Sequence, residues 1–394
     1  MAWLGAFLIG FDSTALNIAV PMIATDFDIG LSAASWVILI YILVVVCCGL
    51  LAGSLANTVG GRRLLIFGFC IFAVGSLLCA VATELYALIA FRALQALGGS
   101  ILYVLGPAVI RRSFAGKEQD WAFGLYCMAP SVGICLGPAL GGLVAGTLGW
   151  PWILLMNLPV CLLALFAVWG LPAEQIDQGR SSVRLDLVGA GLGALSLAGL
   201  VVALNQGREL GFGSPIILSC FCAFAVGIVV FVIWEVKAPA AALDLRVFRI
   251  TTVGLASLSN SLLLFVYAGA SFLLPVYLVW YQGLSVVQAG IVLMLLGGLN
   301  GVLSAQFGRL TRIAKGRTIA TLGGLAVALG LTRLAVAGPE ASLVLIVLSS
   351  SLIGLGMGSQ AIESLEPAEV GFARDEEPTE VRNRRWFMKP DTMD

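Results

Sequence analysis

Two ionisable residues of this 394-residue chain lie inside long apolar stretches and could carry chemistry there. The first is Asp12, about ten residues into the first stretch, or roughly 15 Å along a helix. A charge at that depth of a bilayer costs at least about 2.5–3.5 kcal/mol, and Asn or Ser would form hydrogen bonds more cheaply. We therefore expect a carboxyl group that faces a wet cavity and gains and loses a proton. Burial favours its protonated form and a nearby cation favours its ionised form. The alternative is a structural acid that only forms hydrogen bonds.

The second is Arg92, the only basic residue that we place deep within an apolar stretch, since Arg333 lies near the outer end of its stretch. Gln95, Gly99 and Tyr103 follow it after three, seven and eleven residues, which puts all four on one face of a helix. A polar face in lipid must turn toward the interior of a helix bundle. We expect Arg92 to pair with Asp12 until substrate binding or a conformational change separates them. A structural role, in which Arg92 binds carbonyl groups at a helix end, fits the sequence equally well.

Other polar residues in the apolar stretches could line a cavity, although most such residues only form hydrogen bonds between helices. These candidates are Asn17, Tyr41, Gln95, Tyr103, Tyr126, Asn157, Asn260, Tyr267 and Asn300.

A run of small residues suggests a close contact between helices. Gly133, Gly137 and Gly141 recur every four residues, beside Pro138 and Gly142. This spacing lets two backbones approach closely, and proline bends a helix. We expect a pliable helix that seals the interface of two halves against ion leak; tight packing alone is the alternative.

Composition limits the chemistry that these residues can serve. The chain is 60% hydrophobic and 11% charged, with a mean hydropathy of +1.02, whereas a soluble protein has about 25% charged residues. Soluble enzymes and nucleic-acid binders are excluded, and an integral membrane protein is indicated. There is no histidine, and the nine cysteines lie in apolar stretches without a CxxC pair, so we expect neither a metal site nor a cofactor. No nucleotide-binding P-loop is present, which excludes ATP as the direct energy source.

The elements that must position these residues are transmembrane helices. About 20 apolar residues cross a bilayer, and twelve stretches qualify. Their approximate bounds are 2–21, 35–56, 64–82, 85–110, 121–146, 152–171, 186–205, 215–234, 252–279, 286–307, 318–336 and 342–361. With the N-terminus in the cytoplasm, nearly all of the 22 basic residues, including Arg62 and Arg63, fall on the inner side. We expect a multi-pass protein of the cytoplasmic (inner) membrane with its N-terminus and C-terminal tail in the cytoplasm.

An internal repeat divides the chain. The connections after the second and tenth stretches, Gly53–Arg62 and Gly308–Arg317, share Gly, Leu, Gly and Arg at the same offsets. Aligning them makes the ninth stretch the start of a second repeat. We therefore expect a six-helix half at 1–171, two inserted helices with their links at 172–250, an incomplete four-helix half at 251–362, and a polar, disordered tail at 363–394. The second half is two helices short, which suggests a truncated or frame-altered chain.

Motifs over residues 1 to about 360 resemble those of the major facilitator superfamily, specifically its 14-span drug:proton antiporter group. Residues 10–21 resemble its first-helix motif, 92–99 its fourth-helix motif, 133–142 its fifth-helix antiporter motif and 150–159 a motif of its sixth helix. Gly53 and Gly60 match the superfamily's loop motif, whereas Asn57 replaces the acid that locks a helix junction in the family. The resemblance does not carry that lock over to this chain.

The resemblance implies a major facilitator fold and a proton-coupled transporter that exports amphipathic or cationic small molecules by alternating access. Its partners would be the substrate, protons and the lipid bilayer, and no nucleic acid; participation of a periplasmic adaptor protein is left open. Conformational roles would fall on Gly53, Asn57, Gly60, Arg62, Gly133, Gly137, Pro138, Gly141 and Gly142. Two alternatives are a transport-inactive remnant of such a protein and, with less support, a membrane-embedded enzyme.

Overall fold

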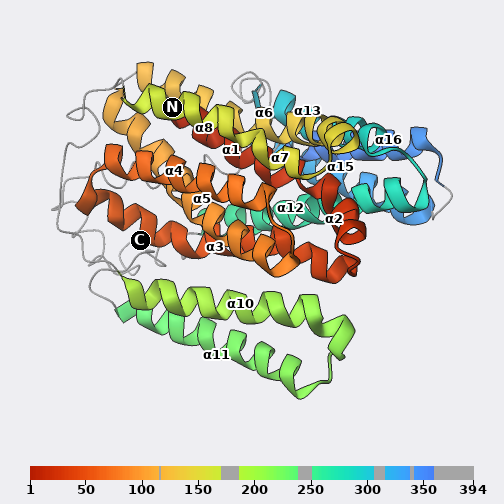
Figure 1. Cartoon of the computed structure of the whole chain (residues 1–394), viewed down its shortest axis with the longest axis horizontal. Helices are drawn as coiled ribbons and strands as arrows, with labels where there is room; N and C mark the ends of the chain where they lie inside the picture. Colours follow the sequence, from red (N-terminus) through yellow and green to blue (C-terminus); the bar gives the residue numbers. More distant parts are fainter. Residues whose placement is uncertain (115–116, 170–185, 238–250, 306–315, 338–340, 359–394) are drawn as a thin grey trace, which may run out of the picture.

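The computed structural model of the chain describes residues 1–114, 117–169, 186–237, 251–305, 316–337 and 341–358. Over these residues every regular element is a helix, and most helices run side by side (Figure 1). Their order is α1 (Ala2–Ala15), η1 (Asn17–Ala19), α2 (Val20–Asp26), α3 (Leu31–Val59), α4 (Gly61–Ala80), α5 (Leu85–Ser113), α6 (Lys117–Leu148), α7 (Pro151–Leu155), α8 (Asn157–Trp169), α10 (Leu187–Leu210), α11 (Pro215–Lys237), α12 (Thr251–Val276), η3 (Tyr277–Tyr281), α13 (Val286–Ala305), α15 (Gly316–Ala337) and α16 (Leu343–Met357). The predicted all-α membrane architecture is confirmed.

Each predicted stretch corresponds to one helix or to a few consecutive helices of the structure. Eleven helical spans are at least 18 residues long and apolar enough to cross a bilayer. The twelfth, α16, is shorter, with 15 residues. The predicted tail at 363–394 and the links of the inserted helices lie outside the described residues.

Proline divides two of the predicted stretches into shorter helices. The first crosses as α1, a 3-10 turn and α2, because Pro21 has no N–H to donate to the carbonyl of Asn17; that carbonyl accepts instead from the N–H of Val20. The sixth divides into α7 and α8 just before Pro159, which likewise lacks a backbone donor. The first break lies within five residues of Asp12 and the second within five residues of Asn157, two polar residues of the site described below.

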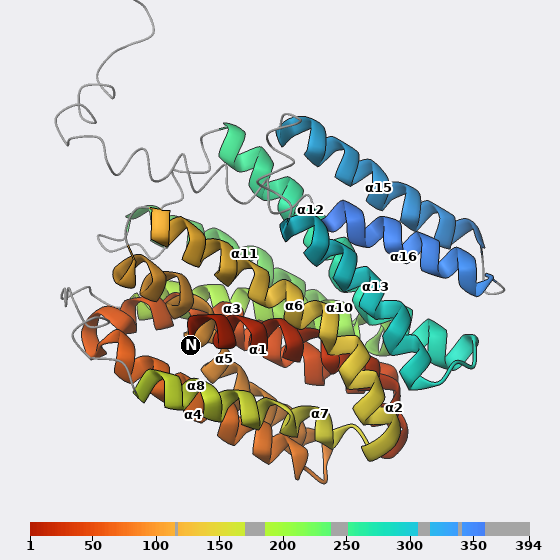
Figure 2. The same ribbon diagram turned by 90° about the horizontal axis from the view of Figure 1, so that it is seen from above.

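Helix α6 connects two groups of helices. It packs along α1 on one side and along α13 on the other. Figure 2 shows α12, α13, α15 and α16 gathered on one side of α6, and α1, α4, α5, α7 and α8 on the other. Side chains of α1, α6 and α13 therefore meet where the two groups of helices join.

Helices α10 and α11, which the internal repeat predicts to be an insert, form a hairpin at the edge of the molecule (Figure 1). Apart from each other, their main neighbour is α3. Asn205 Nδ2 donates a 2.7 Å hydrogen bond to Ser35 Oγ, and Ser32 Oγ donates to the Asn205 carbonyl at 3.3 Å. The outer helix α11 is almost wholly exposed and strongly apolar, as a helix that faces lipid must be.

Candidate functional site

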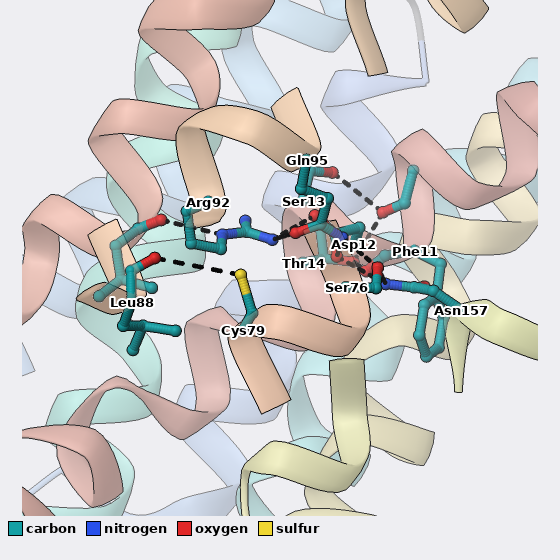
Figure 3. Close-up of polar contacts among 12 residues, drawn as sticks. Phe11, Asp12, Ser13, Thr14, Ser76, Cys79, Leu88, Arg92, Gln95 and Asn157 are labelled. Carbon is teal, nitrogen blue, oxygen red and sulfur yellow. Dashed lines mark hydrogen bonds and ion pairs between the residues drawn. The ribbon is translucent and has the colours of Figure 1, made fainter. Parts of the chain in front are cut away.

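Asp12 lies in the middle of the helices on the α1 side of α6, with only 2% of its surface exposed. Its Oδ2 accepts a 2.8 Å hydrogen bond from Arg92 Nη1, which is also an ion pair. Its Oδ1 accepts from Gln95 Nε2 at 3.1 Å and from Asn157 Nδ2 at 2.9 Å. The carboxyl group thus accepts from three N–H donors, one of which belongs to the cationic Arg92 (Figure 3).

Helix α5 supplies two of those donors from adjacent turns. Arg92 is 1% exposed; besides Asp12, its Nη1 donates to Gln95 Oε1 at 2.5 Å, and its Nε donates to the Val37 carbonyl of α3 at 3.2 Å. Its guanidinium lies 4.4 Å from the centre of the Tyr41 ring, a distance at which a cation is attracted by the ring face. The expected pairing of Arg92 with Asp12 is present, whereas the carbonyl that Arg92 binds belongs to Val37 inside α3 and not to a helix end, as the structural alternative had it.

Two further residues complete this network. Asn157 stands at the first position of α8, and Ser76 comes from α4. Ser76 Oγ accepts from Gln95 Nε2 at 2.7 Å and from Asn157 Nδ2 at 3.4 Å (Figure 3). Ser76 was not among the predicted site residues, because a serine in an apolar helix usually bonds a backbone carbonyl of its own helix and leaves no sequence signal.

We call these five side chains, Asp12, Ser76, Arg92, Gln95 and Asn157, the polar network. They come from α1, α4, α5 and α8, and all of them are buried. One positive and one negative charge compensate each other, so the network as a whole is neutral when Asp12 is ionised. Removing either charge alone would leave the other buried and unpaired. The expectation that Asp12 faces a wet cavity is not met in this conformation. Its side chain is 2% exposed, and hydrogen-bond donors of the protein surround its carboxylate.

Tyr103 lies apart from this network. It continues the helical face of Arg92, Gln95 and Gly99, but its side chain is 58% exposed, whereas the other three are buried. The prediction that all four face the interior is therefore wrong for Tyr103. Three turns beyond Arg92, the described residues leave that face of α5 largely uncovered at Tyr103. Tyr126 Oη donates to the Tyr103 carbonyl at 3.4 Å, and its ring packs over Gly106.

Asn17 lines a small cavity between the two groups of helices. The cavity is bounded by Thr14, Asn17, Pro138, Tyr267, Ser271, Leu293 and Leu296, and it has room for about one water molecule. Asn17 Oδ1 is buried there without a hydrogen-bond partner among the described residues. Of the other predicted cavity residues, Tyr41 touches the polar network as described, and Asn260 is half-buried in α12 and does not bond to Asp12.

The glycines of α6 face two directions. Gly133, Gly137 and Gly141 lie against the backbone and Thr14 of α1, where a Cβ on Gly141 would stand 2.7 Å from the carbonyl oxygen of Ala15. Gly142 faces α13 instead, 2.7 Å from the carbonyl oxygen of Val286 by the same measure.

Helix α13 also has glycines at its contact with α6. A Cβ on Gly290 would collide with the carbonyl oxygen of Pro138, and one on Gly297 would stand 2.7 Å from that of Ile134. The α6–α13 contact is thus built from backbone on both sides.

The loop motif lies at the junction of α3 and α4. Gly60 has a φ of 99°, a conformation that favours glycine, and this lets the chain turn directly from one helix into the next. Arg62 donates from Nη2 to the Trp169 carbonyl at 2.8 Å and from Nε to the Val168 carbonyl at 3.3 Å, and so binds the C-terminal carbonyls of α8. Gly53 and Asn57 belong to α3, but the side chain of Asn57 lies outside the described part of the chain.

Comparison with known proteins identifies this architecture. Residues 2–365 match the family model "Major Facilitator Superfamily". The chain belongs to the major facilitator superfamily. It is 30% identical over 365 residues to the riboflavin transporter RibZ of Clostridioides difficile, covering 90% of this chain and 76% of that protein. It is also 30% identical over 368 residues to the multidrug resistance protein Stp of Mycobacterium tuberculosis, covering 92% of this chain and 67% of that protein. With the probable multidrug resistance protein EmrY of Escherichia coli it shares 29% identity and spans 60% of the relative's length.

Solved structures agree on the fold. The peptide transporter POT in complex with sulfate matches with a TM-score of 0.62 at 16% identity, covering 94% of this chain and 87% of that one. The xylose transporter XylE of E. coli, in a partially occluded inward-open conformation, gives 0.61 at 13% identity over 94% and 87%. At these identities the similarity supports the fold alone. The chain is a multi-pass membrane protein with the fold of a transporter family.

Proposed function

We propose that this member of the superfamily is a proton-coupled secondary transporter that exports amphipathic or cationic small molecules by alternating access. We place it in the 14-span drug:proton antiporter group and in the cytoplasmic membrane, with both termini in the cytoplasm. The multidrug resistance proteins among its relatives support the substrate class. RibZ, at equal identity, is named for riboflavin, so the substrate must be tested rather than inherited.

The observation that carries the proposal is the buried ion pair of Asp12 and Arg92 on the first and fourth spans. A carboxylate in a dry helix core is stable only while its cation stays beside it, so adding a proton and moving the cation are coupled. This coupling gives the protein two states, and a substrate that prefers one of them is driven by protons that prefer the other.

The substrate pathway in this proposal runs through the cavity between the two groups of helices. Thr14 and Asn17 of that cavity follow Asp12 along the first span, so movement of α1 reaches both places. In this conformation the cavity is too small for a drug-sized molecule, and opening it requires α6 and α13 to separate. A cationic substrate in the opened cavity and a proton on Asp12 each add positive charge to the same region, which makes their binding mutually unfavourable.

Asp12→Asn tests the coupling, because Asn keeps the shape of Asp12 and cannot exchange a proton. Cells loaded with ethidium, a lipophilic cation, or with riboflavin are placed at low external pH, and efflux is followed by fluorescence. We expect pH-driven efflux by the Asn variant to fall at least tenfold. Asp28→Asn is the matched control: Asp28 is exposed at the end of the same span with a φ of 52°, a backbone conformation that Asn also tolerates. Unchanged pH-driven efflux in Asp12→Asn would refute the coupling role.

A further inference from the structure

The two amide side chains that donate to Asp12 differ in how firmly they are held. Gln95 uses every polar atom: Nε2 donates to Asp12 and Ser76, and Oε1 accepts from Arg92. Reversing this amide would point its oxygen at the carboxylate and its N–H groups at the guanidinium, two repulsive contacts. Gln95 therefore has one stable orientation.

Asn157 uses only its nitrogen. Nδ2 donates to Asp12 Oδ1 at 2.9 Å and to Ser76 Oγ at 3.4 Å, whereas Oδ1 is buried and no described residue donates a hydrogen bond to it. A buried amide oxygen without a donor costs free energy. A half-turn of this amide loses little at its oxygen end, since nothing is bonded there.

Protonation of Asp12 changes what the carboxyl group needs. The carboxylate accepts from three N–H donors, but a protonated Oδ1 carries an O–H that requires an acceptor. Gln95 Oε1 is already bonded to Arg92. Turning the Asn157 amide would place its oxygen about where Nδ2 now lies, within reach of that O–H and of the Ser76 hydroxyl.

We infer that Asn157 is a positioning residue whose side-chain amide reverses with the protonation state of Asp12, donating to the carboxylate and accepting from the carboxylic acid. The proton enters at Oδ1, which Arg92 does not contact; the guanidinium is then free to move away from Oδ2, as the proposed coupling requires. This inference rests on the proposed proton coupling and deepens it, because it names the group that accommodates the proton.

Other groups near Asp12 do not offer this exchange. Besides Arg92 of α5, the titratable side chains within electrostatic reach of Asp12 are Tyr41 of α3, Cys79 of α4 and Cys161 of α8. None of them is hydrogen-bonded to its carboxylate in the described structure, and α6 presents glycines to α1. Among side chains bonded to Asp12, Asn157 alone has an acceptor without a partner.

Infrared difference spectroscopy of the full chain in lipid vesicles, titrated with acid, tests this without any substrate. The carboxylic acid C=O band that disappears in Asp12→Asn reports protonation of Asp12. Asn157→Leu keeps the volume but neither donates nor accepts. The ionised state loses a stronger, charge-assisted bond than the protonated state, so we expect the titration midpoint of this band to move upward by about one pH unit.

Asn157→Ser keeps a donor and an acceptor on a shorter side chain. It should fold even if Asn157→Leu does not, and we expect it to shift the midpoint by less than Asn157→Leu does. Asn205→Leu, the same substitution on the peripheral hairpin, should leave the midpoint unchanged. If the Asp12 band titrates but neither Asn157 variant moves it, the role of Asn157 is overturned while proton coupling stands. If the band never titrates, both proposals are overturned.

Discussion

The helices on the two sides of α6 bury their polar side chains in opposite ways. On the α1 side, the polar network joins four helices through an ion pair and shared amide hydrogen bonds. On the α13 side, Ser349 and Ser350 of α16 are as deeply buried as Ser76, yet their hydroxyls have no partner among the described residues. Among the described residues, one group of helices therefore has a charged hydrogen-bond network in its core, and the other buries two serines in apolar packing. A proton bound on the α1 side can influence the other side through the contact of α6 with α13 and through η1 and α2, which touch α12 and α13.

The largest effect is expected from breaking the ion pair. Arg92→Leu leaves the Asp12 carboxylate buried without its cation, which should destabilise the protein by about 3–5 kcal/mol. The thermal transition of the purified protein in detergent, followed by intrinsic fluorescence, measures this. The double variant Asp12→Asn with Arg92→Leu has no charge left to bury and should recover part of the loss.

Arg333→Leu is the matched control for that experiment, since Arg333 of α15 is exposed. Its transition should stay close to that of the unmodified chain. If Arg92→Leu proved as mild as Arg333→Leu, the ion pair would not be what holds the α1 side together.

An intermediate effect is expected where α6 meets its two neighbours. Gly137→Ala would press on Thr14 within the α1 side, and Gly290→Ala would press on Pro138 across the interface. Each should cost about 1–3 kcal/mol. The first should lower the thermal transition; the second should favour a separated α6 and α13 and expose Cys135, whose thiol now lies 3.9 Å from the Met294 carbonyl.

Maleimide labelling of Cys135, in a chain whose other cysteines are replaced by alanine, distinguishes the two variants. We expect labelling several-fold faster in Gly290→Ala. Gly324→Ala serves as control, because a Cβ there meets no atom within 4 Å. Equal labelling in the Gly290 and Gly324 variants would show that the α6–α13 contact does not depend on this close approach.

The smallest effect is expected at two equally buried serines, Ser76 on the α1 side and Ser349 on the α13 side. Ser76→Ala removes an acceptor shared by two amides and should cost about 1 kcal/mol. Ser349→Ala removes a hydroxyl that has no partner, so its thermal transition should stay or rise. The reverse order of the two transitions would contradict the distinction drawn between the two sides.

Sequence alone predicted the helices and part of the site for identifiable reasons. Hydropathy located every span, because each must match the thickness of a bilayer. Asp12 and Arg92 stood out because charges are costly there, and the spacing of Arg92 and Gln95 placed them on one face.

The sequence could not show which helix packs against each turn of that face of α5. This is why Tyr103 was wrongly expected in the interior and why Ser76 was missed. Asn157 was only one of several amide and phenol candidates, and nothing in its neighbourhood marked it as a ligand of Asp12. The glycines of α13 were missed for a related reason: Gly290 and Gly297 acquire meaning only opposite Pro138 and Ile134.

The hairpin of α10 and α11 rests on α3, away from the path that a substrate would take. In a protein whose halves tilt against each other, such an appendage travels with the half to which it is attached. A fluorophore on the lipid-facing side of α11 would then report a small tilt of the α1 side as a large displacement, without contact with the proton site or the substrate.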